Sequence, residues 1–197
     1  MHDALNRNMY FVREKIGAFK AVNEYDFLDP ESEQMVFQST EEIGWFTKLL
    51  RFSDYKTISP FNVIISDPGG KQVIRVSRGF SFFRSRVTVF DDTDRPVGQF
   101  LQKLLSIGGA FRLLDMNDNE MGMLQGDWTS WDFTFQGSDG NEIGRVTKEW
   151  AGIGKEMFTT ADNYMLIIDD SVPENHPLRM MILGAVVCID MVLKESR

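Results

Sequence analysis

Residues 180–193, MMILGAVVCIDMVL, form an apolar run close to the C-terminus. As a helix this run extends about 21 Å at about 1.5 Å per residue, whereas a transmembrane helix needs about 20 residues to cross about 30 Å of hydrocarbon. Asp190 lies inside the run, and a charge near the centre of a span costs about 2.5–3.5 kcal/mol. A helix that is apolar on every face must otherwise be surrounded by protein. The run therefore favours a buried core helix over residues 178–194 and leaves a distorted membrane span as the alternative.

A repeated pattern in the preceding sequence indicates what could surround such a helix. A short strand, an acidic or glycine turn and a second strand recur in the segments 35–46, 61–76, 87–100, 111–124 and 133–146. Apolar–polar alternation bounded by Asp, Asn, Gly and Pro is typical of β-hairpins, and residues 9–29 could add two strands. Ten to twelve short antiparallel strands hide their edges by closing into a barrel, which at that size is too wide for its own side chains to fill. The sequence thus predicts a mostly β (α+β) fold, a closed antiparallel barrel of about 12 strands around a central, buried, hydrophobic C-terminal helix.

Length and composition fit one domain with a sizeable core. The chain has 197 residues, of which 43% are hydrophobic and 25% are charged, and these are ordinary globular values. We predict a flexible segment over residues 1–8 and a single domain over residues 9–197. The net charge of -8 argues against a nucleic-acid partner, because phosphate binding needs clustered Lys and Arg.

The cysteine content and the N-terminal stretch bear on location. Cys188 is the single cysteine, so an intrachain disulfide and a Cys-rich zinc site are excluded, and a reducing compartment fits. Residues 1–15 contain no apolar run typical of a secretory signal. We therefore expect a cytoplasmic protein that is not secreted.

The sequence contains no catalytic constellation, so we predict that the protein is not an enzyme and requires no cofactor. His2 and His176 stand in no motif with a nucleophile. Cys188 lies within the apolar helix, where burial without a neighbouring cation makes a thiol unreactive.

Several segments resemble one known family. They are YFVREK at 10–15, YDFLDPESEQMVF at 25–37, PFNVIISDPGGKQVIRVSRGF at 60–80, and GNEIGRVTKEWAGIGKEMFTTADNYML at 140–166 followed by the apolar run. Over residues 9–194 the chain resembles the phospholipid scramblase family of the Tubby-like (LURP-one-related) superfamily. The resemblance implies a Tubby-like closed barrel around a central C-terminal helix, in agreement with the prediction from length and repeat. It also implies phospholipid binding or transbilayer movement at a membrane, with calcium as a candidate cofactor. The alternative is a soluble intracellular ligand-binding or signalling module of the same fold that moves no lipid.

The stretch 71–86 is the candidate membrane-binding site. Animal members of the family carry a cysteine cluster, taken to be lipidated, just after the strand corresponding to residues 71–78, whereas this chain has RGFSFFRSR there. The stretch contains no acid and combines basic with aromatic side chains: Lys71, Arg75, Arg78, Phe80, Phe82, Phe83, Arg84 and Arg86.

Cations beside exposed aromatic rings suit an anionic membrane surface, where each cation contributes about 1 kcal/mol. We hypothesise that unmodified aromatics here replace lipidated cysteines and hold the protein peripherally at the inner face of the plasma membrane. The alternative is an ordinary hairpin whose arginines are solvated and whose phenylalanines face the core.

The calcium site that the resemblance implies would lie between the TADN motif and the final helix. The candidate ligands are Asp162, Asn163, Asp169 and Asp170. Calcium takes six to eight oxygen ligands, and the intervening MLII looks like a buried strand. The alternative is that Asp162 and Asn163 form a turn or cap while Asp169 and Asp170 begin a solvent-exposed loop.

Overall fold

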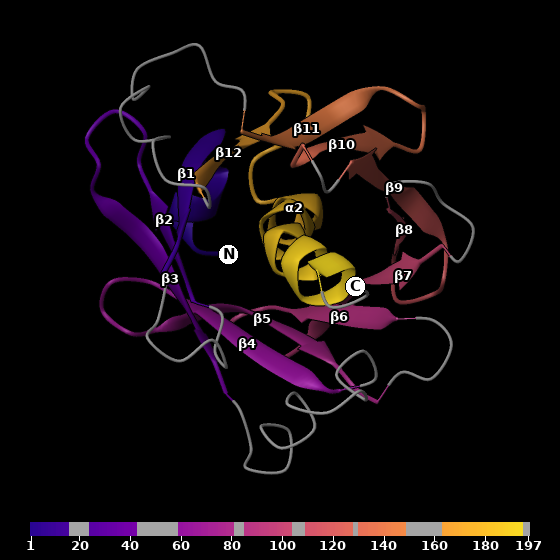
Figure 1. Ribbon diagram of the computed structural model, residues 1–197, viewed down its shortest axis with the longest axis horizontal. Coiled ribbons are helices and arrows are strands. Elements are labelled where there is room, and N and C mark those ends of the chain that lie inside the picture. The colour runs from indigo at the N-terminus through magenta and orange to yellow at the C-terminus, as the bar shows by residue number, and fades with distance from the viewer. Residues whose placement is uncertain are drawn as a thin grey trace.

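A computed structural model of the chain describes residues 1–15, 24–42, 59–80, 85–103, 109–127, 130–148 and 163–194, with side chains as far as residue 192. Within this part of the chain, twelve antiparallel strands form a closed barrel in which sequence neighbours pair and β12 closes against β1 (Figure 1). The strands are β1 (Met9–Glu14), β2 (Tyr25–Leu28), β3 (Met35–Glu41), β4 (Phe61–Ser66), β5 (Gln72–Arg78), β6 (Arg86–Phe90), β7 (Pro96–Gln102), β8 (Ala110–Leu114), β9 (Glu120–Asp127), β10 (Asp132–Gly137), β11 (Glu142–Thr147) and β12 (Asn163–Ile168). The predicted fold class is confirmed.

The hairpin turns follow from one repeated local pattern. In the β8–β9 turn the Asp115 carboxylate accepts hydrogen bonds of 2.8 Å from the backbone N–H groups of Asn117 and Asn119. Three residues after the turn begins, Asp118 has φ 62°, and Asp94 has φ 60° at the same position of the β6–β7 turn. Such a left-handed residue after a type I turn is typical of three-residue hairpin loops, and Asp tolerates it better than most residues. The recurring acidic turns therefore specify the register of each hairpin.

Four of the five predicted hairpins are confirmed, namely 61–76, 87–100, 111–124 and 133–146, which correspond to β4–β5, β6–β7, β8–β9 and β10–β11. The fifth prediction, a hairpin within residues 35–46, is wrong. Its first half is the strand β3, which pairs with β2 on one side and with β4 on the other. The predicted strands within residues 9–29 are present as β1 and β2, and β12 completes the barrel.

The apolar run forms the helix α2 (Pro177–Cys188), which continues as the π-helical segment η4 (Ile189–Lys194). The predicted helix over residues 178–194 is thus confirmed. His176 caps the helix, because its Nδ1 accepts a hydrogen bond from the N–H of Leu178, and Pro177 occupies the first turn, where no donor is needed. Figure 1 shows α2 in the middle of the ring of strands.

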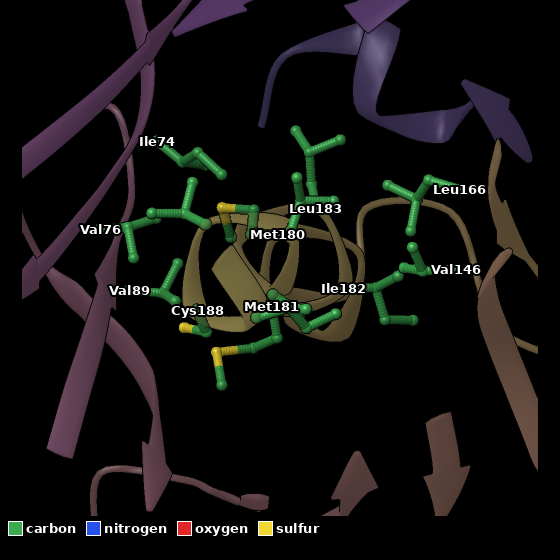
Figure 2. Packing of buried hydrophobic residues seen from close by; sticks show 14 of the residues in the cluster. Ile74, Val76, Val89, Val146, Leu166, Met180, Met181, Ile182, Leu183 and Cys188 are labelled. Atoms are coloured by element: carbon green, nitrogen blue, oxygen red, sulfur yellow. The ribbon is translucent and has the colours of Figure 1, made fainter. Parts of the chain in front are cut away.

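The helix is the core of the barrel. Every residue from Met180 to Cys188 is buried. Figure 2 shows that the helix packs between opposite walls, with Val76 and Val89 on one side and Val146 and Leu166 on the other. The helix and the barrel wall approach closely where a glycine has no side chain. A Cβ at Gly98 of β7 would lie 2.7 Å from the Met181 sulfur. Of the two alternatives for the apolar run, the buried core helix is the one present.

No helix in the described part of the chain combines the length and the hydrophobicity that a bilayer crossing demands.

One polar contact crosses the core near the end of the helix. Asp190 is buried and accepts a hydrogen bond from the Tyr25 hydroxyl. Burial and the neighbouring Asp190 carboxylate raise the pKa of Tyr25 well above its ordinary value, so Tyr25 remains a donor. This bond ties the last part of the helix to the start of β2.

Residues 1–8, for which the sequence predicts a flexible segment, are held against the barrel. They include the 3-10 helix η1 (Asp3–Asn6), and Leu5 is only 1% exposed. The buried Arg179 guanidinium binds this segment to the helix by donating to the Leu5 and Arg7 carbonyls and to the Asn8 side chain. The sequence prediction missed this because the partners are backbone carbonyls about 170 residues away in the chain.

Candidate functional site

The two ends of the barrel differ in kind. Five short hairpin turns (β2–β3, β4–β5, β6–β7, β8–β9 and β10–β11) and the connection from β12 to α2 lie at one end, which we call the turn end. The opposite end, at which β1, β3, β5, β7, β9 and β11 finish, we call the loop end. Because β12 runs from the loop end to the turn end, α2 enters the barrel at the turn end and its last residues lie toward the loop end.

The turn end is strongly acidic. Its six connecting segments, residues 29–34, 67–71, 91–95, 115–119, 137–141 and 169–176, contain 13 acidic and two basic residues, a net charge of -11 in a chain whose total is -8. Asp67, Asp91, Asp115 and Asp139 recur at intervals of 24 residues, and this spacing is the signal that could have revealed the shared surface from sequence. An anionic membrane would repel this end of the barrel.

Hydrogen bonds within the turns keep their aspartates ionised. The Asn119 side-chain amide and backbone N–H lower the pKa of Asp115, and the backbone N–H of Asn141 lowers the pKa of Asp139. The turn end therefore stays negatively charged down to more acidic pH than isolated aspartates would.

These lowered pKa values predict a loss of stability in acid. A group whose pKa is lower in the folded chain stabilises the fold above its unfolded pKa, near 3.9, and this contribution disappears as the pH falls through the folded value. We expect Asp115→Asn to lower the melting temperature at pH 7, and the gap to the parent protein to close below about pH 4. Melting curves between pH 7 and pH 2 measure this effect. Asp92→Asn is the control, because the Asp92 carboxylate accepts no hydrogen bond within the described residues; a gap for Asp115→Asn that is constant with pH would contradict the prediction.

The predicted membrane-binding stretch 71–86 does not form one continuous surface. The strand β5 separates Lys71, in an acidic turn at the turn end, from Phe80, beyond the strand at the loop end. Seven strand residues extend about 23 Å, so the two side chains cannot meet the same membrane surface. Phe82, Phe83 and Arg84 lie outside the described residues.

The three arginines of the stretch that the structure describes, Arg75, Arg78 and Arg86, are engaged within the protein. Arg78 is 3% exposed and donates a 2.5 Å hydrogen bond to the Ser59 carbonyl, and its guanidinium lies 4.8 Å from the centre of the Phe61 ring. The prediction that Arg78 faces a membrane is therefore wrong, because alternation along β5 turns it inward. Arg75 pairs with Asp94 at 2.8 Å and Arg86 with Asp118 at 2.9 Å. The sequence alone suggested five unpaired cations in this stretch. The acids that neutralise Arg75 and Arg86 come from other hairpins.

Phe80 is the one aromatic member of the predicted site among the described residues, and it is exposed as expected. Its side chain is 55% exposed, the most exposed of the large apolar side chains in the described residues. It lies at the loop end, directly after β5 and opposite the acidic turns. An exposed aromatic ring away from the negative charge is an arrangement that suits contact with a membrane interface.

The predicted calcium ligands do not form a single site. Asn163 begins β12 and is buried, whereas Asp169 follows its last residue. The strand places them about 20 Å apart, although oxygens that share one calcium ion lie within about 5 Å of each other. Asp169 accepts a bond from the N–H of Ser171 in a turn, and Asp170 binds the Asn8 amide; Asp162 lies outside the described residues. Within the described part of the chain, no three His, Cys, Asp or Glu side chains gather as a metal site.

The groups considered for catalysis have structural roles. His2 caps η1 by accepting from the N–H of Ala4, as His176 caps α2. Burial raises the pKa of the Cys188 thiol well above its ordinary value, which keeps the sulfur in its unreactive form.

Comparison with known proteins identifies relatives over almost the whole chain. The model of the family described as Scramblase matches residues 9–196. The chain is 22% identical over 189 residues to the Altered inheritance rate of mitochondria protein 25 of Saccharomyces cerevisiae, with 84% of this chain and 57% of that protein covered. It is 23% identical over 195 residues to a protein of Schizosaccharomyces pombe described as a phospholipid scramblase family protein, with 90% of this chain and 51% of that protein covered. The chain thus spans about half the length of these curated relatives. No solved structure gives a significant match.

Proposed function

Because the chain belongs to the Scramblase family, we propose that it is a phospholipid scramblase-like protein that contacts an anionic membrane with the loop end of its barrel. The observation that carries this proposal is the position of Phe80, exposed at the end opposite a net charge of -11. Charge repulsion orients the turn end away from the membrane, and the Phe80 ring at the loop end enters the membrane interface. Family membership supports a lipid-related role. The location at the inner face of the plasma membrane stays a prediction.

Flotation with vesicles tests the contact. The purified protein is mixed with neutral or anionic vesicles and separated on a density gradient. We expect flotation with the anionic vesicles. Phe80→Ser should weaken the apparent partition coefficient about fivefold, because partial burial of a phenylalanine ring contributes about 1 kcal/mol. Met116→Ser is a matched control, since Met116 is 44% exposed but lies in an acidic turn at the turn end. If both variants float equally well, the loop end is not the contact surface.

A second candidate function is a ligand-binding or signalling module that moves no lipid. It is favoured by the burial of α2 on all sides, because a helix sealed within a barrel cannot line a path for lipids. A translocation assay on the same vesicles, with fluorescent phospholipid in one leaflet, separates the two functions. Lipid exchange above the protein-free rate supports scrambling, and flotation without exchange supports the second candidate.

The calcium dependence that the family resemblance implies is part of the proposal. The described residues offer no assembled ligand set, so calcium would act through oxygens on more than one segment or through the membrane lipids. Flotation and lipid exchange are therefore measured with calcium and with a chelator. A difference between the two conditions supports calcium dependence, and identical results remove it from the proposal.

A further inference from the structure

The two histidines of the chain, His2 and His176, cap their helices with the same atom. The Nδ1 of His2 accepts a 3.2 Å hydrogen bond from the N–H of Ala4 at the start of η1. The Nδ1 of His176 accepts a 3.2 Å hydrogen bond from the N–H of Leu178 at the start of α2. An imidazole nitrogen accepts a hydrogen bond only while it carries no proton. Both caps therefore require a neutral imidazole with its proton on Nε2.

The two capped helices meet where residues 1–8 are held against the barrel. The buried Leu5 belongs to η1, and the Arg179 guanidinium, in the first turn of α2, donates to its carbonyl at 3.4 Å. Next to the cap of α2, the N–H of Asn175 donates a 2.9 Å hydrogen bond to the side-chain oxygen of Asn6. A change at either cap therefore affects the contact between residues 1–8 and the start of α2.

The charged groups around the two imidazoles differ. The Nε2 of His2 lies 3.5 Å from the Asp67 carboxylate, so a proton on His2 would replace the cap by an ion pair. No carboxylate of the described residues lies within ion-pair distance of His176, and a proton there would add a second cation beside Arg179 at the start of α2, where the helix dipole disfavours positive charge. The elements that meet at His176 carry these charged groups: Asp169, Asp170 and Glu174 in its own connection, Arg179 in α2, and Asp3 and Arg7 in the N-terminal segment. Protonation therefore removes the cap at His176 without a compensating contact.

We propose that His176 is a pH-sensitive cap whose protonation in mild acid releases residues 1–8 and the first turn of α2. Imidazole takes up its proton near pH 6.5. Because the folded cap needs the neutral ring, its contribution to stability is complete above about pH 7.5 and is lost as the pH falls toward about pH 5.5. Asp169, in the same connection, stays ionised over this range, because hydrogen bonds from Ser171 lower its pKa. This switch does not depend on the proposed membrane contact.

Hydrogen exchange followed residue by residue with NMR tests the proposal. Exchange rates are measured between about pH 7.5 and about pH 5.5, and the intrinsic rate at each pH is divided by the measured rate to give the protection of each amide. The Leu178 amide reports the cap, and the Asn175 amide reports the contact with residues 1–8. We expect the protection of both to fall about tenfold over this range, because loss of a cap and a cation at the helix start shift the opening equilibrium by about that factor. The amides of β7 should keep their protection.

Two matched variants separate the His176 cap from other effects of acid. Asparagine is a strong N-cap and takes up no proton in this range, so His176→Asn should keep the protection of both amides constant with pH. His2→Asn, the same change at the other cap, should leave the fall of about tenfold in place. A fall of equal size in His176→Asn, or constant protection in the parent protein, overturns the proposal. A fall at Leu178 alone, with Asn175 unchanged, overturns the release of residues 1–8.

Discussion

Replacing Arg179 with methionine is expected to lower the free energy of unfolding by about 3–5 kcal/mol. The guanidinium is 3% exposed and donates five hydrogen bonds to oxygen atoms. Its acceptors are the Leu5, Arg7, Val172 and Pro173 carbonyls and the Asn8 side chain. Each buried acceptor left without a partner costs about 1–3 kcal/mol, and water at the barrel rim recovers part of the sum.

The position of Arg179 in the helix shows that its stabilising effect comes from these hydrogen bonds and not from a favourable interaction with the helix dipole. It lies in the first turn of α2, where the helix dipole disfavours a cation. Arg179→Lys keeps the charge but has three donors in place of five, so we expect an intermediate loss of stability. Arg95→Met is the control, because Arg95 has a 78% exposed side chain and one surface ion pair, worth at most about 1 kcal/mol. Denaturant unfolding followed by far-UV circular dichroism measures all three variants. A loss below about 1 kcal/mol for Arg179→Met would show that residues 1–8 are not fastened by this guanidinium.

Replacing Gly184 with leucine is expected to destabilise the protein by about 3 kcal/mol or more. Gly184 lies where α2 touches the β5–β6 wall: a Cβ there would stand 3.2 Å from side-chain carbons of both Val76 and Val89. The barrel is closed and each strand is hydrogen-bonded on both sides, so the wall cannot open to admit a larger side chain without breaking pairs. Overpacking of this kind forces strained rotamers and shifts of the backbone.

Gly184→Ala provides the graded comparison. Its single methyl group requires shifts of a few tenths of an ångström in Val76 and Val89, and the higher helix propensity of alanine contributes about 1 kcal/mol in the opposite direction. We therefore expect a change close to zero for alanine and a large loss for leucine, measured by thermal unfolding. If the leucine variant has the same melting temperature as the parent protein, the helix does not pack against this wall as closely as described.

The acidic turns and the membrane stretch show why local sequence gives an incomplete account of a surface. Within residues 71–86 the chain has five cations and no acid, and the simple inference is a basic patch. In the folded barrel Asp94 and Asp118 arrive from other hairpins and pair with Arg75 and Arg86, while Arg78 turns inward. Net charge along a strand therefore says little about charge on the wall, because neighbouring hairpins place their own charged side chains on the same surface.

The outer wall over β9, β10 and β11 has a polar groove that could not be inferred from its residues. Gln125, Thr134 and Glu142 belong to three different strands and carry no motif. They line one groove because the antiparallel register places outward-facing positions of β9, β10 and β11 side by side. A sequence fixes which positions alternate outward, but the concavity comes from the twist and closure of the sheet.

The sequence alone determined the architecture of this protein. An apolar run too short for a bilayer, together with a recurring pattern of strand, acidic turn and strand, specified a barrel with a helix inside, because both features are visible in short stretches of the sequence. The tertiary structure decided everything that depends on distance between hairpins. It brought the Leu5 and Arg7 carbonyls to Arg179, Tyr25 to Asp190, and six acidic segments to one end. These contacts arise from ring closure and strand register, which place residues together whatever their separation in the chain.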